Sequence, residues 1–105
     1  MMNFNRSPLE SNLQKKVINY IKSTFKNQAW LLNVAGSAVQ RSGVPDILVC
    51  TNGTFIGIEL KREDGSGRPS PQQIIECKKI TQAGGHAIIS NDFEEIKKLL
   101  LKFKK

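Results

Sequence analysis

Two carboxylates and a lysine stand in one short and otherwise apolar stretch, residues 43–61. Asp46 lies near the start of the stretch, and Glu59 and Lys61 lie near its end. Carboxylate oxygens are the ligands that hard divalent cations prefer, and a lysine ammonium group can offset negative charge. The chemistry open to these side chains therefore depends on whether the fold brings them together.

The Asn52-Gly53 pair predicts that it does. Asn-Gly between alternating apolar residues is a strong signal for a β-hairpin, because both residues tolerate the positive φ of a type I′ turn. The resulting register places Asp46 opposite Glu59, and the strand period of two points Lys61 to the same face. Opposed carboxylates are destabilising, so a divalent cation is the simplest compensation, and oxygen ligands without a His or Cys cluster favour Mg²⁺ or Mn²⁺.

A simpler interpretation is that Asp46 closes a loop while Glu59 and Lys61 form an exposed ion pair at a strand end. The composition of the hairpin argues against it, because both faces carry apolar or small residues and are expected to be covered. One face holds Ile47, Val49, Ile56, Ile58 and Leu60, and the other holds Leu48, Cys50, Phe55 and Gly57. We therefore favour a metal site at the charged end of a buried hairpin.

The chain has 105 residues, enough for one domain spanning residues 1–105, with residues 1–6 expected to be disordered. It contains no apolar run long enough to cross a membrane and no signal-peptide pattern, so we expect a soluble cytoplasmic protein. Cys50 and Cys77 are expected to be core thiols rather than a disulfide or metal site.

The formal net charge of +7 predicts a polyanionic partner. Three arginines flank the carboxylates in predicted loops, where they could contact phosphates: Arg41, Arg62 and Arg68. Aromatic residues are few and scattered, so a platform for stacking single-stranded bases is not evident.

Periodicity and capping signals predict the order αβββαβα, an α/β fold. The first helix begins at Ser7-Pro8 and carries an apolar stripe of Leu13, Val17, Ile21 and Phe25. The first strand, residues 29–34, is expected to bury Trp30. The second helix begins at Ser70-Pro71 with an inward row of Ile74, Cys77 and Thr81, and the last helix has a stripe that includes Phe93, Ile96, Leu100, Leu101 and Phe103.

Several positions have two interpretations. Glu10 could close a capping box or point toward the sheet along with Gln14, and Gln73 could cap the second helix or reach the charged end of the hairpin. His86 is expected to have a structural role at the start of the fourth strand rather than a catalytic one. The broad stripe of the last helix could bury a two-fold partner or simply wrap around the core.

Four segments together resemble the virus-type replication-repair nuclease (VRR-NUC) domain of the PD-(D/E)XK nuclease superfamily, over almost the whole chain. They are residues 41–47 (Arg-Ser-Gly-Val-Pro-Asp-Ile), 59–61 (Glu-Leu-Lys), 67–73 (Gly-Arg-Pro-Ser-Pro-Gln-Gln) and 83–85 (Ala-Gly-Gly). The resemblance implies a restriction-endonuclease-like fold with a central mixed sheet flanked by helices.

The resemblance also implies roles for individual residues. Carboxylates of Glu10, Asp46 and Glu59, with the backbone carbonyl of Leu60, would hold Mg²⁺ or Mn²⁺. Lys61 would position or activate the attacking water, and Gln73 matches a glutamine that the family places near the site. The implied reaction is endonucleolytic hydrolysis of DNA that leaves 5′-phosphate and 3′-hydroxyl ends, with no small-molecule cofactor.

A chain this short has no room for a separate recognition domain, which favours recognition of DNA backbone and shape. The family analogy favours branched DNA and a homodimeric Holliday-junction resolvase, because a symmetrical cut of a four-way junction needs two active sites. The alternatives are another nuclease role, such as nicking, flap or restriction-type cleavage, and a non-catalytic nucleic-acid-binding module.

Overall fold

The computed structural model describes residues 8–34, 41–62 and 67–105, with side chains described from residue 12 onward. The expected disorder of residues 1–6 and the expected cap at Ser7 lie outside the described residues. The connection over residues 35–40 and the segment 63–66 also lie outside them.

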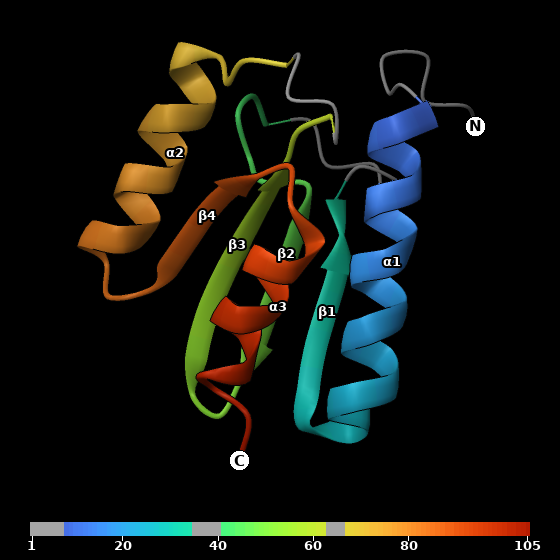
Figure 1. Cartoon of the computed structure of the whole chain (residues 1–105). Coiled ribbons are helices and arrows are strands. Elements are labelled where there is room, and N and C mark those ends of the chain that lie inside the picture. The colour runs from blue at the N-terminus through green and yellow to red at the C-terminus, as the bar shows by residue number, and fades with distance from the viewer. Residues whose placement is uncertain (1–7, 35–40, 63–66) are drawn as a thin grey trace.

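The described elements follow the predicted order, with one short 3₁₀ helix added after the first α-helix (Figure 1). They are α1 (Pro8–Phe25), η1 (Lys26–Gln28), β1 (Ala29–Asn33), β2 (Ile47–Thr51), β3 (Thr54–Leu60), α2 (Pro71–Gln82), β4 (His86–Ser90) and α3 (Phe93–Leu101). The α/β prediction is confirmed.

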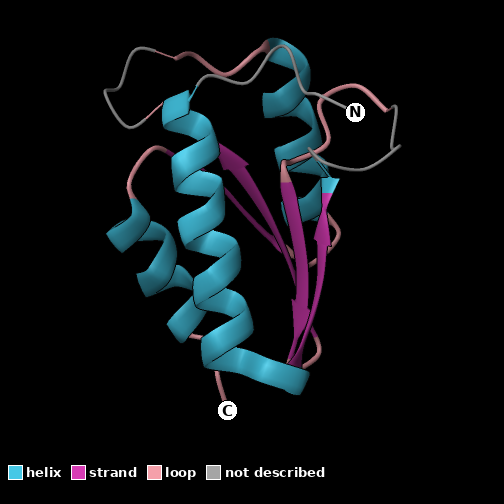
Figure 2. Cartoon of the chain, turned by 90° about the vertical axis from the view of Figure 1, so that its right-hand side faces the viewer, coloured by secondary structure: helices cyan, strands magenta, loops and turns pink. Residues whose placement is uncertain are grey.

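Within the described residues, the strands form one mixed sheet in the order β1-β2-β3-β4. Strand β2 runs antiparallel to both β1 and β3, and β4 runs parallel to β3 after the crossover through α2. Helices α1 and α3 contact each other on one face of the sheet, while α2 packs against β3 and β4 on the opposite face (Figure 2). The sheet is therefore the middle layer of three.

The predicted hairpin register is confirmed. Thr51 pairs with Thr54, and the ladder continues in the predicted register as far as Ile47 and Ile58. Asn52 and Gly53 have φ values of 50° and 73°, as the two central residues of a type I′ turn require. The local chemistry of this turn fixes which residues of β2 and β3 share a face.

The core lies between α1, α3 and the inner face of the sheet. The predicted α1 stripe of Leu13, Val17, Ile21 and Phe25 is at most 2% exposed. It packs on side chains of β2 and β3 that are equally buried and on Ile96 and Leu100 of α3. Burying a side chain of this size contributes about 1.5 to 3 kcal/mol. This core gives the carboxylate-bearing strands a rigid base.

The outer face of the sheet differs from the prediction. Trp30 is 56% exposed and Cys50 is exposed, although both were expected in the core. These residues pair with each other across β1 and β2, and Cys50 pairs with Phe55, which is 39% exposed. The reason is that α2 covers the outer face over β3 and β4 and leaves β1 and β2 open.

Helix α2 also differs, because its predicted inward row lies along an open groove beside β4 and is not buried. Ile74 is 39% exposed, Thr81 is exposed and Cys77 is half-buried, whereas Glu76 is 6% exposed. The inward face includes a charged residue because the loop before β2 supplies a partner for it, as described below.

Helix α3 mainly wraps around the core of its own chain. Ile96 and Leu100 are fully buried, whereas Leu101 is 46% exposed. The ring of His86, the first residue of β4, lies 4.6 Å from the ring of Phe103 between centroids, in keeping with a structural role. None of the helices described is long and apolar enough to cross a membrane.

Candidate metal and nuclease site

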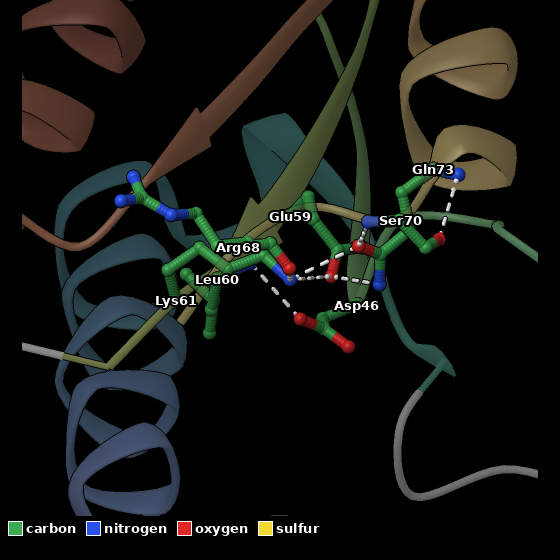
Figure 3. A network of polar contacts seen from close by, with 7 residues as sticks. All are labelled: Asp46, Glu59, Leu60, Lys61, Arg68, Ser70 and Gln73. Carbon is green, nitrogen blue, oxygen red and sulfur yellow. Dashed lines mark hydrogen bonds and ion pairs between the residues drawn. The ribbon is translucent and has the colours of Figure 1, made fainter. Parts of the chain in front are cut away.

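Asp46 lies immediately before β2, at the end of the antiparallel ladder. Its backbone carbonyl accepts a hydrogen bond from the Val34 amide at 2.8 Å, and its carboxylate Oδ2 accepts one from the Leu60 amide at 2.9 Å. The backbone contact extends the register of β1 and β2 by one residue, whereas at β3 the ladder ends and the Asp46 side chain binds the backbone instead. Asp46 is therefore held beside Leu60, the last residue of β3, on the same face as Glu59 (Figure 3).

Glu59 is 3% exposed and lies near the end of β3. Its Oε2 accepts a hydrogen bond of 2.7 Å from the Gln73 side-chain amide, and the Lys61 ammonium group lies 3.6 Å from the same oxygen. A carboxylate this deeply buried requires polar partners of this kind. The predicted cluster of Asp46, Glu59 and Lys61 at one end of the hairpin is therefore present in the fold.

Lys61 is fixed from several directions. Its side chain is 13% exposed, and its Nζ donates to Gln73 Oε1 at 3.0 Å and to the Arg68 carbonyl at 3.4 Å. Its backbone amide donates to the Ser90 carbonyl of β4 at 2.9 Å. The ammonium group is thus presented at the same edge of the sheet as the two carboxylates (Figure 3).

Gln73 performs both of the roles that the sequence left open. Its Oε1 accepts the Ser70 amide at 2.8 Å while the Ser70 hydroxyl accepts the Gln73 amide at 3.2 Å, which is a complete capping box. The same side chain donates to Glu59 and accepts from Lys61. The start of α2 is therefore built directly onto the carboxylate cluster.

Glu10 lies in the first turns of α1, but its side chain is outside the described part of the structure. One turn later, the Gln14 amide donates a short hydrogen bond to Asn33, the last residue of β1. Asn33 pairs with Ile47, the residue after Asp46. The α1 backbone around Glu10 thus begins near the charged end of the sheet, and its role as a ligand remains a prediction.

The donor set suits a hard cation. Among the described side chains no group of three or more His, Cys, Asp or Glu could hold a metal ion, and Asp46 and Glu59 are the two predicted carboxylate ligands whose side chains are described. Burial and the charges of Glu59 and Glu76 raise the pKa of the Cys77 thiol, which keeps this nearby thiol protonated and poorly suited to bind metal. Oxygen ligands of this type fit Mg²⁺ or Mn²⁺, with Glu10 and the Leu60 carbonyl as the further ligands that the resemblance implies.

The three arginines occupy different environments. The Arg41 guanidinium lies 2.8 Å from the Glu76 carboxylate, although its own side chain is 63% exposed. Arg62 and Arg68 are exposed beside Lys61. All three lie where a bound polyanion could reach them, and their contact with DNA remains a prediction.

Sequence reasoning did not identify Glu76 as a buried residue. Its signal was present, because Gln72, Glu76 and Ile80 follow each other at helical spacing and share one face of α2. The row of Ile74, Cys77 and Thr81 is the predicted inward one instead, and the structure buries Glu76 in the neighbouring row.

Two solved structures are similar to this chain over most of its length. One, described as "VRR_NUC domain", has 25% sequence identity and a TM-score of 0.68, with 92% of this chain and 99% of that chain covered. Another, described as "VRR_NUC domain protein", has a TM-score of 0.69 with 93% of this chain and 89% of that chain covered. At 18% identity this second structure supports the fold alone. No family model and no curated protein matches the sequence.

Proposed function

We infer from the similarity to VRR_NUC structures that this chain is a VRR-NUC domain, and we propose that it is a metal-dependent nuclease that hydrolyses phosphodiester bonds of DNA. The observation that carries the proposal is the cluster of Asp46, Glu59 and Lys61 on one face of the sheet. Such a cluster has a physical cost in a protein that only binds DNA, because it places buried negative charge where a phosphate must approach.

In the proposed site, Asp46 and Glu59 would hold the divalent cation, together with Glu10 and the Leu60 carbonyl. When bound, the cation would supply positive charge to neutralise the phosphate and to make the attacking water more acidic. Asp46 is oriented by the Leu60 amide and Glu59 by Gln73, so both carboxylates are positioned before substrate arrives. This preorganisation avoids the cost of ordering the ligands during the reaction.

Lys61 supplies a fixed positive charge at the reacting phosphate. Its hydrogen bonds to Gln73 and Arg68 hold the ammonium group at the edge of the cluster, where it can orient water and offset charge that develops on the phosphoryl oxygens. The water oxygen bonds to phosphorus as the bond to the 3′ oxygen breaks. The 3′ oxygen gains a proton as the water loses one, which gives 5′-phosphate and 3′-hydroxyl ends.

We further propose that the substrate is branched DNA and that the active form is a homodimeric Holliday-junction resolvase. The formal net charge of +7 and the exposed Arg62 and Arg68 support recognition of the phosphate backbone. The paired cuts that resolve a four-way junction require two copies of this single site.

The test is cleavage of a panel of labelled four-way junction, flap, nicked and linear duplex DNAs with Mg²⁺, Mn²⁺ or EDTA. The proposal predicts cation-dependent cutting that prefers the junction, by a protein that light scattering shows to be a dimer. Equal cutting of junction and duplex, or a monomer, would contradict the resolvase assignment. Binding to DNA without cleavage in either cation would contradict the nuclease assignment.

A further inference from the structure

A second charged cluster, centred on Glu76 of α2, takes no part in the chemistry proposed for Asp46, Glu59 and Lys61. The Glu76 side chain is 8% exposed, and its Oε1 lies 2.8 Å from Arg41 Nη2. Its Oε2 accepts a hydrogen bond of 3.4 Å from Gln72 and lies 3.5 Å from Lys79 Nζ. Gln72 and Lys79 belong to α2, as Glu76 does, whereas Arg41 comes from the loop that leads into Asp46.

That loop is docked at two further points before it reaches Asp46. Gly43 has a φ of +83° and lies so close to α2 that a Cβ there would be 2.6 Å from the Gln72 carbonyl oxygen. Pro45 is fully buried, and a Cβ on Gly57 of β3 would lie 3.0 Å from its ring. Arg41 and Gly43 therefore contact α2, and Pro45 contacts β3.

The first turn of α2 also contacts Glu59, the second carboxylate of the proposed site. Gln73 binds Glu59 and Lys61, while its neighbour Gln72 contacts Gly43 and Glu76. Helix α2 therefore links the two chain segments that carry Asp46 and Glu59. The ion pair between Arg41 and Glu76 connects the segment that carries Asp46 to this helix.

We propose that Arg41 and Glu76 are positioning residues whose ion pair sets the place of Asp46 relative to Glu59, and so sets the affinity of the site for its divalent cation. This inference rests on the proposed function. Neither side chain touches the cation or the substrate in this role. Loss of the pair leaves the loop attached through Gly43 and Pro45, so we expect the site to loosen without loss of the overall fold.

The electrostatics of Glu76 suit such a role. Burial by itself raises the pKa of Glu76, but the hydrogen bond and charge of Arg41, aided by Lys79, outweigh burial and hold the pKa below its ordinary value of 4.5. The carboxylate is therefore ionised at neutral pH, and the pair is fully formed under the conditions in which a nuclease works.

The test measures binding of Mn²⁺ alone to the full chain by titration calorimetry, with no DNA present. We expect Glu76→Gln to weaken Mn²⁺ binding about 10-fold to 100-fold, the range for residues that orient metal ligands. Cleavage at saturating Mn²⁺ should stay within a few-fold of the unaltered protein. The matched control is Glu94→Gln, which removes an exposed ion pair to Lys97 on α3 and should leave Mn²⁺ affinity unchanged.

Two further variants keep the result decisive. Arg41→Gln leaves Glu76 with Lys79 and Gln72, and it should weaken Mn²⁺ binding as Glu76→Gln does, even if that variant fails to fold. The charge exchange Arg41→Glu with Glu76→Arg should recover part of the lost affinity.

Unchanged Mn²⁺ affinity in folded Glu76→Gln or Arg41→Gln overturns the inference. So does a result in which Arg41→Gln weakens DNA binding in EDTA but leaves Mn²⁺ affinity intact, since Arg41 would then act on DNA. Absence of Mn²⁺ binding by the unaltered protein has a different meaning, because it overturns the proposed function and this inference with it.

Discussion

Gln73 joins the cap of α2 to the carboxylate cluster, and replacing it with leucine tests that connection. Leucine is similar in size but makes none of the hydrogen bonds. The bond from Gln73 to buried, charged Glu59 contributes about 1.5 to 3 kcal/mol, and the bond from the Ser70 amide contributes about 0.5 to 1.5 kcal/mol. We expect Gln73→Leu to lower the free energy of unfolding by about 2 to 4.5 kcal/mol.

The matched control is Ser70→Ala, which removes the other half of the capping box and leaves the Gln73 side chain in place. Loss of such a cap costs about 1 kcal/mol. The assay is urea denaturation followed by circular dichroism, together with DNA cleavage in Mn²⁺. Gln73→Leu should lose most of its cleavage activity, while Ser70→Ala should keep most of it.

Equal losses of stability and activity in the two variants would refute this reasoning. Gln73 would then act only as a helix cap, and its short contact with Glu59 would have no separate energetic role. The expected result is that Gln73→Leu loses more stability and more cleavage activity than Ser70→Ala.

Three further predictions follow from other contacts. Gly57→Ala should lower the free energy of unfolding by about 1 to 3 kcal/mol in urea denaturation, because the added Cβ would lie 2.9 Å from the Ile80 side chain; unchanged stability would mean that this packing is loose. Burial and the charges of Glu59 and Glu76 raise the pKa of Cys77. In a Cys50→Ser background, the rate of Cys77 alkylation should therefore keep increasing with pH even where an ordinary thiol is already fully ionised. A pH profile like that of a free thiol would contradict this. Since the folded pKa of Glu76 is lowered, its contribution to stability is present above about pH 4.5 and is lost as pH falls through that lower pKa, so unfolding measured against pH should be less acid-sensitive in Glu76→Gln.

The hairpin could be predicted closely because its determinants are local. Asn52-Gly53 specifies a turn type, the turn specifies the register, and the register brings Glu59 beside the segment that carries Asp46. The one difference is at the end of the ladder. Asp46 leaves the strand and binds the Leu60 amide, so the two carboxylates are neighbours rather than a ladder pair.

The outer face could not be predicted because strand periodicity assigns side chains to two faces without saying which face a helix will cover. Trp30 and Cys50 lie on the face that α2 leaves open, so residues with core-like character are exposed. Glu76 shows the reverse error. Its burial depends on Arg41, which is distant in sequence and reaches α2 only through the fold.

The measurement that tests the central claim most directly is cleavage of four-way junction DNA by the unaltered protein and by Asp46→Asn, purified identically and assayed with Mn²⁺ and with EDTA. The unaltered protein should cut only when Mn²⁺ is present and should leave 5′-phosphate and 3′-hydroxyl ends. Asp46→Asn should bind the junction with similar affinity and cut at least about 100-fold more slowly, a loss of about 2.7 kcal/mol or more in transition-state stabilisation. Full activity of Asp46→Asn, or cutting in EDTA, would contradict the account.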